Sequence, residues 1–226
     1  MSHSHQIGVI IPVLNEEASI GLVLDSIPPQ YLKNVVVVDN GSEDQTKNII
    51  HKKNVKIISE SRRGYGRAVL RGIEEHQNKD IIVFCDGDYS DYTEEMDLLI
   101  QPIIEDKADF VLGSRMKLAE AGALLPQSRW GNKLAVFLIK CMTGFSYSDL
   151  GPFRAIRKST LDQLNMQDKN FGWTVEMQMK AIRKNLRILE IPVRYRKRVG
   201  VSKITGTLGG TVRAGCKIIY SIIKWK

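Results

Sequence analysis

The sequence predicts a single α/β domain in which a mostly parallel β-sheet is covered by helices on both faces. Short apolar runs, rich in β-branched residues, alternate with segments whose apolar residues recur at helical spacing. Polar groups follow four of these runs, as Asn15-Glu16, Asp39-Asn40, Arg63-Gly64 and Asp86-Gly87-Asp88. The carboxyl ends of parallel strands lie along one edge of a sheet. These groups are therefore expected to gather there, where open α/β sheets bind ligands.

Five strands and four helices are expected to alternate in the first half of the chain. The strands are expected at residues 7–12, 35–38, 55–59, 81–84 and 110–112, and the helices at residues 16–27, 42–52, 67–76 and about 93–103. Ser42, with Gln45 three residues later, is typical of a capping box at the start of the second helix. Thr93 is expected to cap the fourth helix.

The second half of the chain is less regular. Residues 130–142 are apolar on most sides, which predicts either a buried helix or a helix lying against lipid. A helix is expected at residues 173–184, followed by a strand at residues 186–191 that ends at Pro192.

The last predicted helix, at about residues 207–225, is basic and amphipathic. Apolar and basic residues are expected on different faces: Leu208, Val212, Ile219 and Ile222 on one, Arg213, Lys217 and Lys224 on another. A helix of this kind lies in a membrane interface or packs on the protein core. The sequence leaves both alternatives open.

The composition is that of a soluble globular protein, with 226 residues, 43% hydrophobic and 26% charged. The three cysteines are widely spaced, which argues against a disulfide framework or a cysteine zinc site and fits a reducing compartment. The first six residues lack the apolar core of a signal peptide, and no apolar run is long enough to span a bilayer. A cytoplasmic location is therefore expected.

The chain is basic, because 33 lysines and arginines outnumber 25 acidic residues to give a net charge of +8. A basic surface attracts nucleic acid, anionic lipid or phosphorylated substrates. The sequence contains no RNA-binding aromatic motif and no zinc-finger spacing, so no nucleic-acid partner is expected. A non-catalytic protein that binds nucleic acid or a membrane surface through its basic C-terminal part is kept as an alternative.

Asp86 and Asp88 are the most informative pair of side chains. They follow a buried run and are two positions apart, so in an extended segment they share one face. Gly87 between them lets a ligand approach the backbone. Two carboxylates on one side of a cleft suit Mg²⁺ or Mn²⁺, which complete their coordination with water and phosphate. The alternative is a surface turn, in which these residue types are common.

Eight short segments between residues 12 and 203 form an ordered set. They are Pro12-Val13-Leu14-Asn15-Glu16, residues 38–46, Arg63-Gly64-Tyr65-Gly66-Arg67-Ala68, Asp86-Gly87-Asp88, Gly113-Ser114-Arg115, Asp149 with Phe153-Arg154, Glu176, and Gly200-Val201-Ser202-Lys203. This set resembles family 2 glycosyltransferases of the GT-A fold, and among them the dolichol-phosphate mannosyltransferase-like branch. The resemblance covers most of the chain and is much less specific for a sugar or an acceptor.

The resemblance implies transfer of a sugar from a GDP- or UDP-sugar, with Mg²⁺ or Mn²⁺ bridging the diphosphate, in one inverting displacement. Residues 1–115 would form the donor-binding half, residues 116–205 the acceptor-binding half, and residues 206–226 the C-terminal helix. The acceptor in this branch is a polyprenyl (dolichyl or undecaprenyl) phosphate. Peripheral association with the cytoplasmic face of a membrane is therefore expected, as a homodimer or with a membrane-protein partner.

The resemblance also implies a set of donor-binding residues. They are Pro12, Leu14, Glu16, Val38, Asp39, Asn40, Cys85, Asp86, Gly87, Asp88, Arg198 and Lys203. Asp86 and Asp88 would hold the metal and the diphosphate, which makes Asp88 a catalytic residue. Ser90 or Asp91 would be a third, weaker metal contact. Many relatives have an aspartate in place of Asn40, and an amide both donates and accepts, so the preferred base stays open.

The resemblance further implies that the acceptor phosphate contacts Arg115, Arg129 and Ser202. Guanidinium groups bind phosphate in a two-pronged geometry, which fits this role for the two arginines. Asp149 matches the position of the catalytic base in many family 2 enzymes. A base is needed if the acceptor is a hydroxyl of a cell-surface glycan. If the acceptor is an ionised lipid phosphate, Asp149 only orients an arginine. A nucleotidyltransferase, which would release pyrophosphate, is a further alternative.

Overall fold

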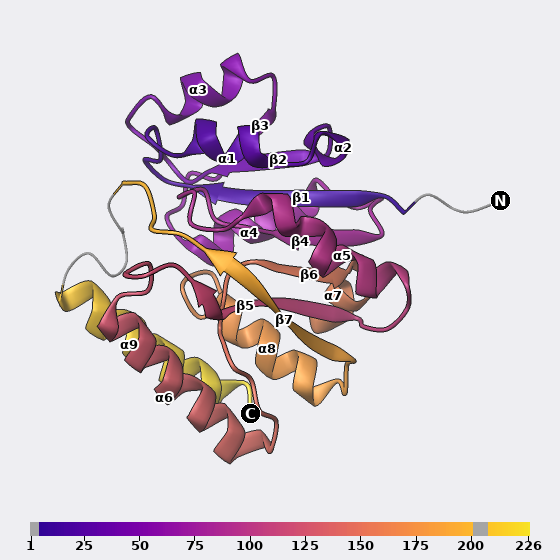
Figure 1. Ribbon diagram of the computed structural model, residues 1–226, viewed down its shortest axis with the longest axis vertical. Helices are drawn as coiled ribbons and strands as arrows, with labels where there is room; N and C mark the ends of the chain where they lie inside the picture. Colours follow the sequence, from indigo (N-terminus) through magenta and orange to yellow (C-terminus); the bar gives the residue numbers. More distant parts are fainter. Residues whose placement is uncertain (1–4, 201–207) are drawn as a thin grey trace.

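The computed structural model describes residues 5–200 and 208–226, with side chains from residue 215 onward in the second range. Seven strands form one sheet in the order β3-β2-β1-β4-β6-β5-β7. They are β1 (Ile7–Val13), β2 (Val35–Asp39), β3 (Lys56–Ser59), β4 (Ile81–Phe84), β5 (Phe110–Ala119), β6 (Arg154–Arg157) and β7 (Ile188–Tyr195). β6 runs antiparallel to both neighbours, and the other pairs are parallel. The predicted mostly parallel sheet is confirmed (Figure 1).

Helices cover both faces of this sheet. They are α1 (Ile20–Ser26), α2 (Pro29–Leu32), α3 (Thr46–Lys52), α4 (Tyr65–Glu74), η1 (Thr93–Glu95, a 3₁₀ helix), α5 (Met96–Ile104), α6 (Pro126–Thr143), α7 (Lys158–Leu164), α8 (Trp173–Arg183) and α9 (Leu208–Lys224). α1, α3 and α5 contribute to one core cluster, and α4, α6, α7, α8 and α9 to a second. In β1, Val9 and Ile11 belong to the first cluster and Ile10 to the second. Burial on both faces explains why the inner strands are continuous apolar runs.

Two strands extend beyond their predicted ends. β7 continues through Pro192 to Tyr195, because an edge strand tolerates a residue without an N–H group. β5 continues past Gly113 to Ala119, paired with β7 across an irregularity between Ser114 and Leu118. The sequence does not predict β6 or α7, since such short elements show too little periodicity.

The two predicted helix caps are wrong. Ser42 Oγ accepts a hydrogen bond from the backbone N–H of Asn15 (2.9 Å), and α3 begins only at Thr46. Thr93 lies in η1, where its hydroxyl shares a hydrogen bond with the Ser26 hydroxyl. Both hydroxyl groups connect elements that are distant in sequence. A local pattern cannot reveal that choice, because capping and long-range contacts compete for the same oxygen.

Helix α9 packs on the core and also exposes apolar side chains. Ile222 and Trp225 are buried in the second core cluster, whereas Ile219, Tyr220 and Ile223 are exposed. Ile219 and Ile222, three positions apart, therefore differ in burial. In the described ranges we find no helix with both the length and the apolar character needed to cross a bilayer.

The carboxyl ends of β1, β2 and β4 lie together, as predicted. Val13 is in register with Asp39, and Ile10 with Phe84. The strand order reverses at β1 and β4, since β2 lies on one side of β1 and β4 on the other. Such a reversal is where open α/β sheets bind ligands. It places the turn after β4 beside the loop after β1.

Candidate active site

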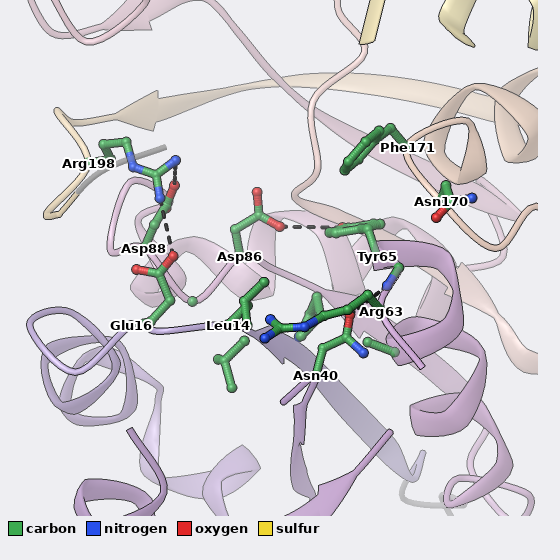
Figure 2. A pocket seen from close by; sticks show the side chains of 15 residues that line it. Leu14, Glu16, Asn40, Arg63, Tyr65, Asp86, Asp88, Asn170, Phe171 and Arg198 are labelled. Carbon is green, nitrogen blue, oxygen red and sulfur yellow. Dashed lines mark hydrogen bonds and ion pairs between the residues drawn. The ribbon is translucent and has the colours of Figure 1, made fainter. Parts of the chain in front are cut away.

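A cavity of about 300 Å³ opens at this edge of the sheet. Its wall is formed by Pro12, Val13, Leu14, Glu16, Asn40, Arg63, Gly64, Tyr65, Ala68, Asp86, Gly87, Asp88, Asn170, Phe171 and Arg198. Figure 2 shows two sides of this wall. We call Glu16, Asp86, Asp88 and Arg198 the carboxylate side, and Tyr65, Asn170 and Phe171 the aromatic side.

Asp86 and Asp88 lie in the turn directly after β4. A Cβ atom on Gly87 would be 2.6 Å from Val13 Cγ1, so a glycine allows this turn to pack closely on β1. Asp88 Oδ1 accepts a hydrogen bond from the Ser90 N–H (3.0 Å). Asp86 Oδ1 accepts one from the Tyr65 hydroxyl (3.3 Å). Burial raises the pKa of Tyr65 well above its ordinary range, so this hydroxyl stays a donor.

Negative charge accumulates around this pair. Burial and the neighbouring Asp88 raise the pKa of Asp86 to about 7, although Arg198 and Arg115 act in the opposite direction. Burial, with the charges of Asp86 and Asp88, also raises the pKa of Asp91 well above its ordinary value. Asp91 Oδ2 accepts a hydrogen bond from the Asp86 N–H (3.2 Å), and Oδ1 is buried without a partner among the described residues. An excess of buried carboxylate favours binding of a cation.

The residues present therefore fit a divalent cation held by two carboxylates. The oxygen ligands of Asp86 and Asp88 suit Mg²⁺ or Mn²⁺. Across residues 5–200 and 208–226, no cluster of three or more acidic, histidine or cysteine side chains is arranged to hold a metal. The remaining ligands would be water and a diphosphate.

Arg198 connects the two acidic loops. Its guanidinium is 3.2 Å from Glu16 Oε1 and 3.3 Å from Asp88 Oδ2 (Figure 2). The segment after β7 is held here by its backbone, since the Val199 N–H donates to the Asp88 carbonyl oxygen (2.9 Å). The other two residues predicted in this loop, Ser202 and Lys203, lie outside the described residues.

Asn40 holds the loop that follows β3. Its Oδ1 accepts a hydrogen bond from the Gly64 N–H (2.8 Å), and its Nδ2 donates to the carbonyl oxygens of Glu60 and Arg62 (both 2.9 Å). An aspartate could not donate these two bonds. The amide at this position is therefore explained by the loop it supports, while one edge of Asn40 still lines the cavity.

The glycines of the Arg63-Gly64-Tyr65-Gly66 segment allow another loop to approach. A Cβ atom on Gly64 would overlap the Lys169 carbonyl oxygen, and one on Gly66 would overlap that of Asp168. Gly64 also has a φ of 146°, which other residues rarely adopt. The Arg67 N–H donates to the Lys169 carbonyl oxygen (3.2 Å). This contact brings Asn170 and Phe171 from the second half of the chain to the cavity.

Arg115 and Asp149 form a buried ion pair beyond the acidic turn. Arg115 Nε and Nη2 donate to Asp149 Oδ2 and Oδ1, each at 2.8 Å, and the Arg115 N–H also donates to Oδ2 (2.9 Å). Burial acts to raise the pKa of Asp149, but Arg115 holds it below its ordinary value. Both carboxylate oxygens of Asp149 thus accept hydrogen bonds from the Arg115 side chain. Arg129 lies exposed near the start of α6, and neither arginine lines the cavity.

Eight predicted donor-binding residues line the cavity, namely Pro12, Leu14, Glu16, Asn40, Asp86, Gly87, Asp88 and Arg198. Three others do not line it. Val38 and Cys85 are buried in the core clusters. Asp39 accepts hydrogen bonds from the N–H groups of Gly41 and Ser42 (3.1 and 3.0 Å), so it shapes the loop after β2.

Sequence reasoning missed the aromatic side of the cavity. Tyr65 is part of a recognisable segment, and its place between two glycines could have marked it as facing a ligand. Asn170 and Phe171 carry no such signal. They reach the cavity only because residues 168–170 pack against Gly64 and Gly66.

Residues 8–164 match the family model described as Glycosyl transferase family 2. The chain belongs to this family. It is therefore a glycosyltransferase, and the predicted family is confirmed.

Relatives of this glycosyltransferase extend the likeness to almost the whole chain. An uncharacterized glycosyltransferase of Mycobacterium tuberculosis is 31% identical over 208 residues, which cover 91% of this chain and 93% of the relative. UDP-N-acetylglucosamine–dolichyl-phosphate N-acetylglucosaminyltransferase of Methanococcus voltae is 28% identical over 242 residues, with 96% and 95% covered. The predicted likeness to dolichol-phosphate sugar transferases is thus confirmed.

The fold is shared with a solved glycosyltransferase. The crystal structure of glucosyl-3-phosphoglycerate synthase from Mycobacterium tuberculosis, in complex with Mn²⁺, UDP-glucose and phosphoglyceric acid, superposes with a TM-score of 0.76 at 20% identity. The superposition covers 98% of this chain and 80% of that one. This likeness shows the GT-A fold.

Proposed function

We propose that this enzyme transfers a sugar from a nucleotide sugar to a polyprenyl phosphate at a membrane surface. The observation that carries the proposal is the state of Asp149, whose two carboxylate oxygens both accept hydrogen bonds from Arg115. A hydroxyl acceptor needs a base to take its proton, whereas an ionised phosphate does not. A carboxylate bound in this way is suited to hold an arginine for a phosphate. The relative named for transfer to dolichyl phosphate supports the same acceptor class.

The cavity is the proposed site of the nucleotide sugar. Pro12, Leu14 and the loop held by Asn40 would contact the nucleoside, and Asp86 and Asp88 would hold Mg²⁺ or Mn²⁺ with the diphosphate. When bound, the metal would offset the charge that develops on the leaving diphosphate. Arg198 is placed beside the same carboxylates and would bind the diphosphate as well.

The proposed reaction is a single displacement with inversion at the sugar. An oxygen of the acceptor phosphate forms a bond to C1 of the sugar while the bond from C1 to the nucleoside diphosphate breaks, and the nucleoside diphosphate leaves. Arg115, oriented by Asp149, would bind the acceptor phosphate. Its charge lowers the pKa of Asp86, which supports a position within electrostatic range of the donor. Arg129 lies near the start of α6 and would contact the acceptor as the acceptor approaches along that helix.

Helices α6 and α9 form the proposed membrane-binding surface. They lie side by side (Figure 1), and neither contains an acidic residue. Apolar side chains are exposed on α9 and on or next to α6: Leu125, Trp130, Phe137, Ile219, Tyr220 and Ile223. Exposed aromatic and apolar groups among lysines and arginines favour the interface of an anionic membrane. We propose that this is the cytoplasmic face, which the three free cysteines support.

The predicted division of the chain is kept as part of this proposal. Residues 1–115 would bind most of the donor, because twelve of the fifteen lining residues come from that half. The other three, Asn170, Phe171 and Arg198, come from the proposed acceptor half. Residues from both halves of the chain are therefore expected to be needed for a complete donor site.

The acceptor is tested by offering polyprenyl phosphate in vesicles and glycan hydroxyl acceptors in separate assays, each with a panel of UDP- and GDP-sugars and Mn²⁺. We expect sugar transfer to the lipid phosphate, with release of nucleoside diphosphate. The Asp149→Asn variant should keep turnover with the lipid within about tenfold, whereas loss of a general base would cost about 100- to 10,000-fold. Transfer only to hydroxyl acceptors, abolished in Asp149→Asn, would contradict the proposal.

A further inference from the structure

Three residues form a row along the inner face of helix α9. Lys217 and Ser221 in α9 and Trp225 directly after its end are four positions apart, which places them on the same side. The row faces α8 and the segment of residues 167–172 before it, and α8 and α9 are in contact. The opposite side of α9 carries the exposed Ile219 and Ile223.

Lys217 is bound to an aspartate in that segment. Its Nζ is 2.6 Å from Asp168 Oδ2, and the Asp168 side chain is only 3% exposed, compared with 29% for Lys217. Asp168 Oδ1 also accepts a hydrogen bond from the Asn170 N–H (2.8 Å). A single carboxylate therefore joins α9 to the backbone of a residue that lines the cavity.

The other two residues of the row strengthen this contact. Ser221 is fully buried, and a Cβ atom on Gly172 would overlap its hydroxyl oxygen. The Trp225 ring lies 4.2 Å from Lys180 Nζ, which is 2.6 Å from Glu176 Oε1. Glu176 in turn accepts hydrogen bonds from the N–H groups of residues 167 and 168 (2.8 and 2.6 Å). α9 thus contacts the segment both directly and through α8.

The segment held in this way is the aromatic side of the cavity. Asn170 and Phe171 line it, and Figure 2 shows them beyond Tyr65, away from Asp88 and Arg198. The carbonyl oxygens of Asp168 and Lys169 occupy the space that side chains at positions 66 and 64 would need. A shift of Asp168 would therefore move both Asn170 and the loop that carries Tyr65.

We propose that Lys217 is a positioning residue for the donor site, so that helix α9, through Asp168, sets the affinity for the nucleotide sugar. The proposal rests on the assignment of the cavity as the donor site. Lys217 touches neither the donor nor the acidic pair, and acts by holding Asn170 and Phe171. Its loss should weaken donor binding and leave the chemical step intact, since Asp86, Asp88 and Arg198 each have a contact that does not involve this segment, with Asp91, Ser90 and Glu16 respectively.

The test is the affinity for UDP and GDP in the presence of Mn²⁺, measured by isothermal titration calorimetry on the full chain. Lys217→Met should raise the Kd of whichever nucleotide the wild type binds by about tenfold, because a half-buried charged hydrogen bond is lost. Lys217→Arg, which keeps the cation, should restore the Kd to within about threefold. Lys184→Met removes the same charge from an exposed site at the end of α8 and should change nothing. In turnover assays Lys217→Met should raise the donor KM and leave kcat and the acceptor KM unchanged.

Two further results complete the test. The double variant Lys217→Met with Asp168→Asn should bind no more weakly than the weaker single variant, since both break one contact. Unchanged donor affinity in Lys217→Met, or a fall in kcat with unchanged donor KM, would overturn the inference while leaving the proposed function intact. A wild type that binds neither nucleotide with Mn²⁺, nor any other nucleoside diphosphate, would overturn the proposed function and the inference together.

Discussion

The acidic pair and the aromatic side of the cavity are held by contacts of different range. On the carboxylate side, Asp86 and Asp88 follow β4 directly, and Ser90, two residues further on, binds the Asp88 carboxylate. On the aromatic side, Asn170 and Phe171 depend on Asp168, which is bound by α9 and packs against a glycine at the start of α4. The acidic pair is the product of a single turn, whereas the aromatic side depends on three separate parts of the chain.

Because of this difference, we expect the two sides of the cavity to affect different quantities. The carboxylate side should affect the rate of sugar transfer, and the aromatic side the affinity for the donor. Substitutions on the carboxylate side should remove groups that act on the diphosphate, so they should lower turnover strongly. Substitutions on the aromatic side should loosen a wall of the site, so they should weaken donor binding and lower stability. The following predictions test that separation, from the largest expected effect to the smallest.

Asp88→Ala should lower sugar transfer by about 100- to 1000-fold, because a preorganised group near the developing charge is lost. Asp25→Ala, which breaks an exposed ion pair with Lys53, is the matched control and should retain full activity. Adding EDTA to the wild type should have the same effect as Asp88→Ala, and both are read from release of nucleoside diphosphate. Full turnover in Asp88→Ala would show that the Asp88 carboxylate is not needed for the reaction.

Gly64→Ala should destabilise the protein by about 2–5 kcal/mol, because it combines an unfavourable φ with overlap of the Lys169 backbone. Gly131→Ala is the control. Gly131 lies within α6, and a Cβ atom there meets nothing within 4 Å, so alanine should stabilise the helix by up to about 1 kcal/mol. Urea denaturation measures both. If the two variants were equally stable, the close approach of the two loops would be disproved.

Asn40→Asp should cost about 1–3 kcal/mol of stability, because the carbonyl oxygens of Glu60 and Arg62 lose their donor. It should also raise the Kd for the nucleotide, since the loop that carries Tyr65 is released. Asn48→Asp, at an exposed site in α3, should be near neutral. Thermal unfolding with and without nucleotide and Mn²⁺ separates the two effects. An Asn40→Asp protein as stable as the wild type would show that the amide does not support the loop.

Trp130→Ser should lower binding to anionic vesicles by about tenfold, since a large exposed aromatic group no longer enters the interface. Binding of soluble nucleotide should be unchanged, because Trp130 is not part of the cavity wall. Leu22→Ser, which alters an exposed apolar residue on α1, serves as the control in vesicle sedimentation. Equal loss in both variants would argue against a membrane surface specific to α6 and α9.

The sequence by itself determined the features that depend on neighbouring residues. Runs such as residues 35–38 predict buried strands because burial on both faces demands continuous apolar character. The position of Asp86 and Asp88 after such a run then predicts where they lie in the sheet. The sequence also allowed eight residues of the cavity wall to be predicted. Each belongs to a loop that follows a strand or to a segment recognisable by family resemblance.

Only the tertiary structure decided the features in which one side chain has several possible partners. The hydroxyl of Ser42 binds Asn15 rather than capping α3, and Pro192 is tolerated because β7 lies at the edge of the sheet. Asp149 became a partner of Arg115, and Lys217 a partner of Asp168, through folding of distant segments. Sequence spacing contains no information on such pairs, because the energy that selects them is that of burial and charge pairing in the completed core.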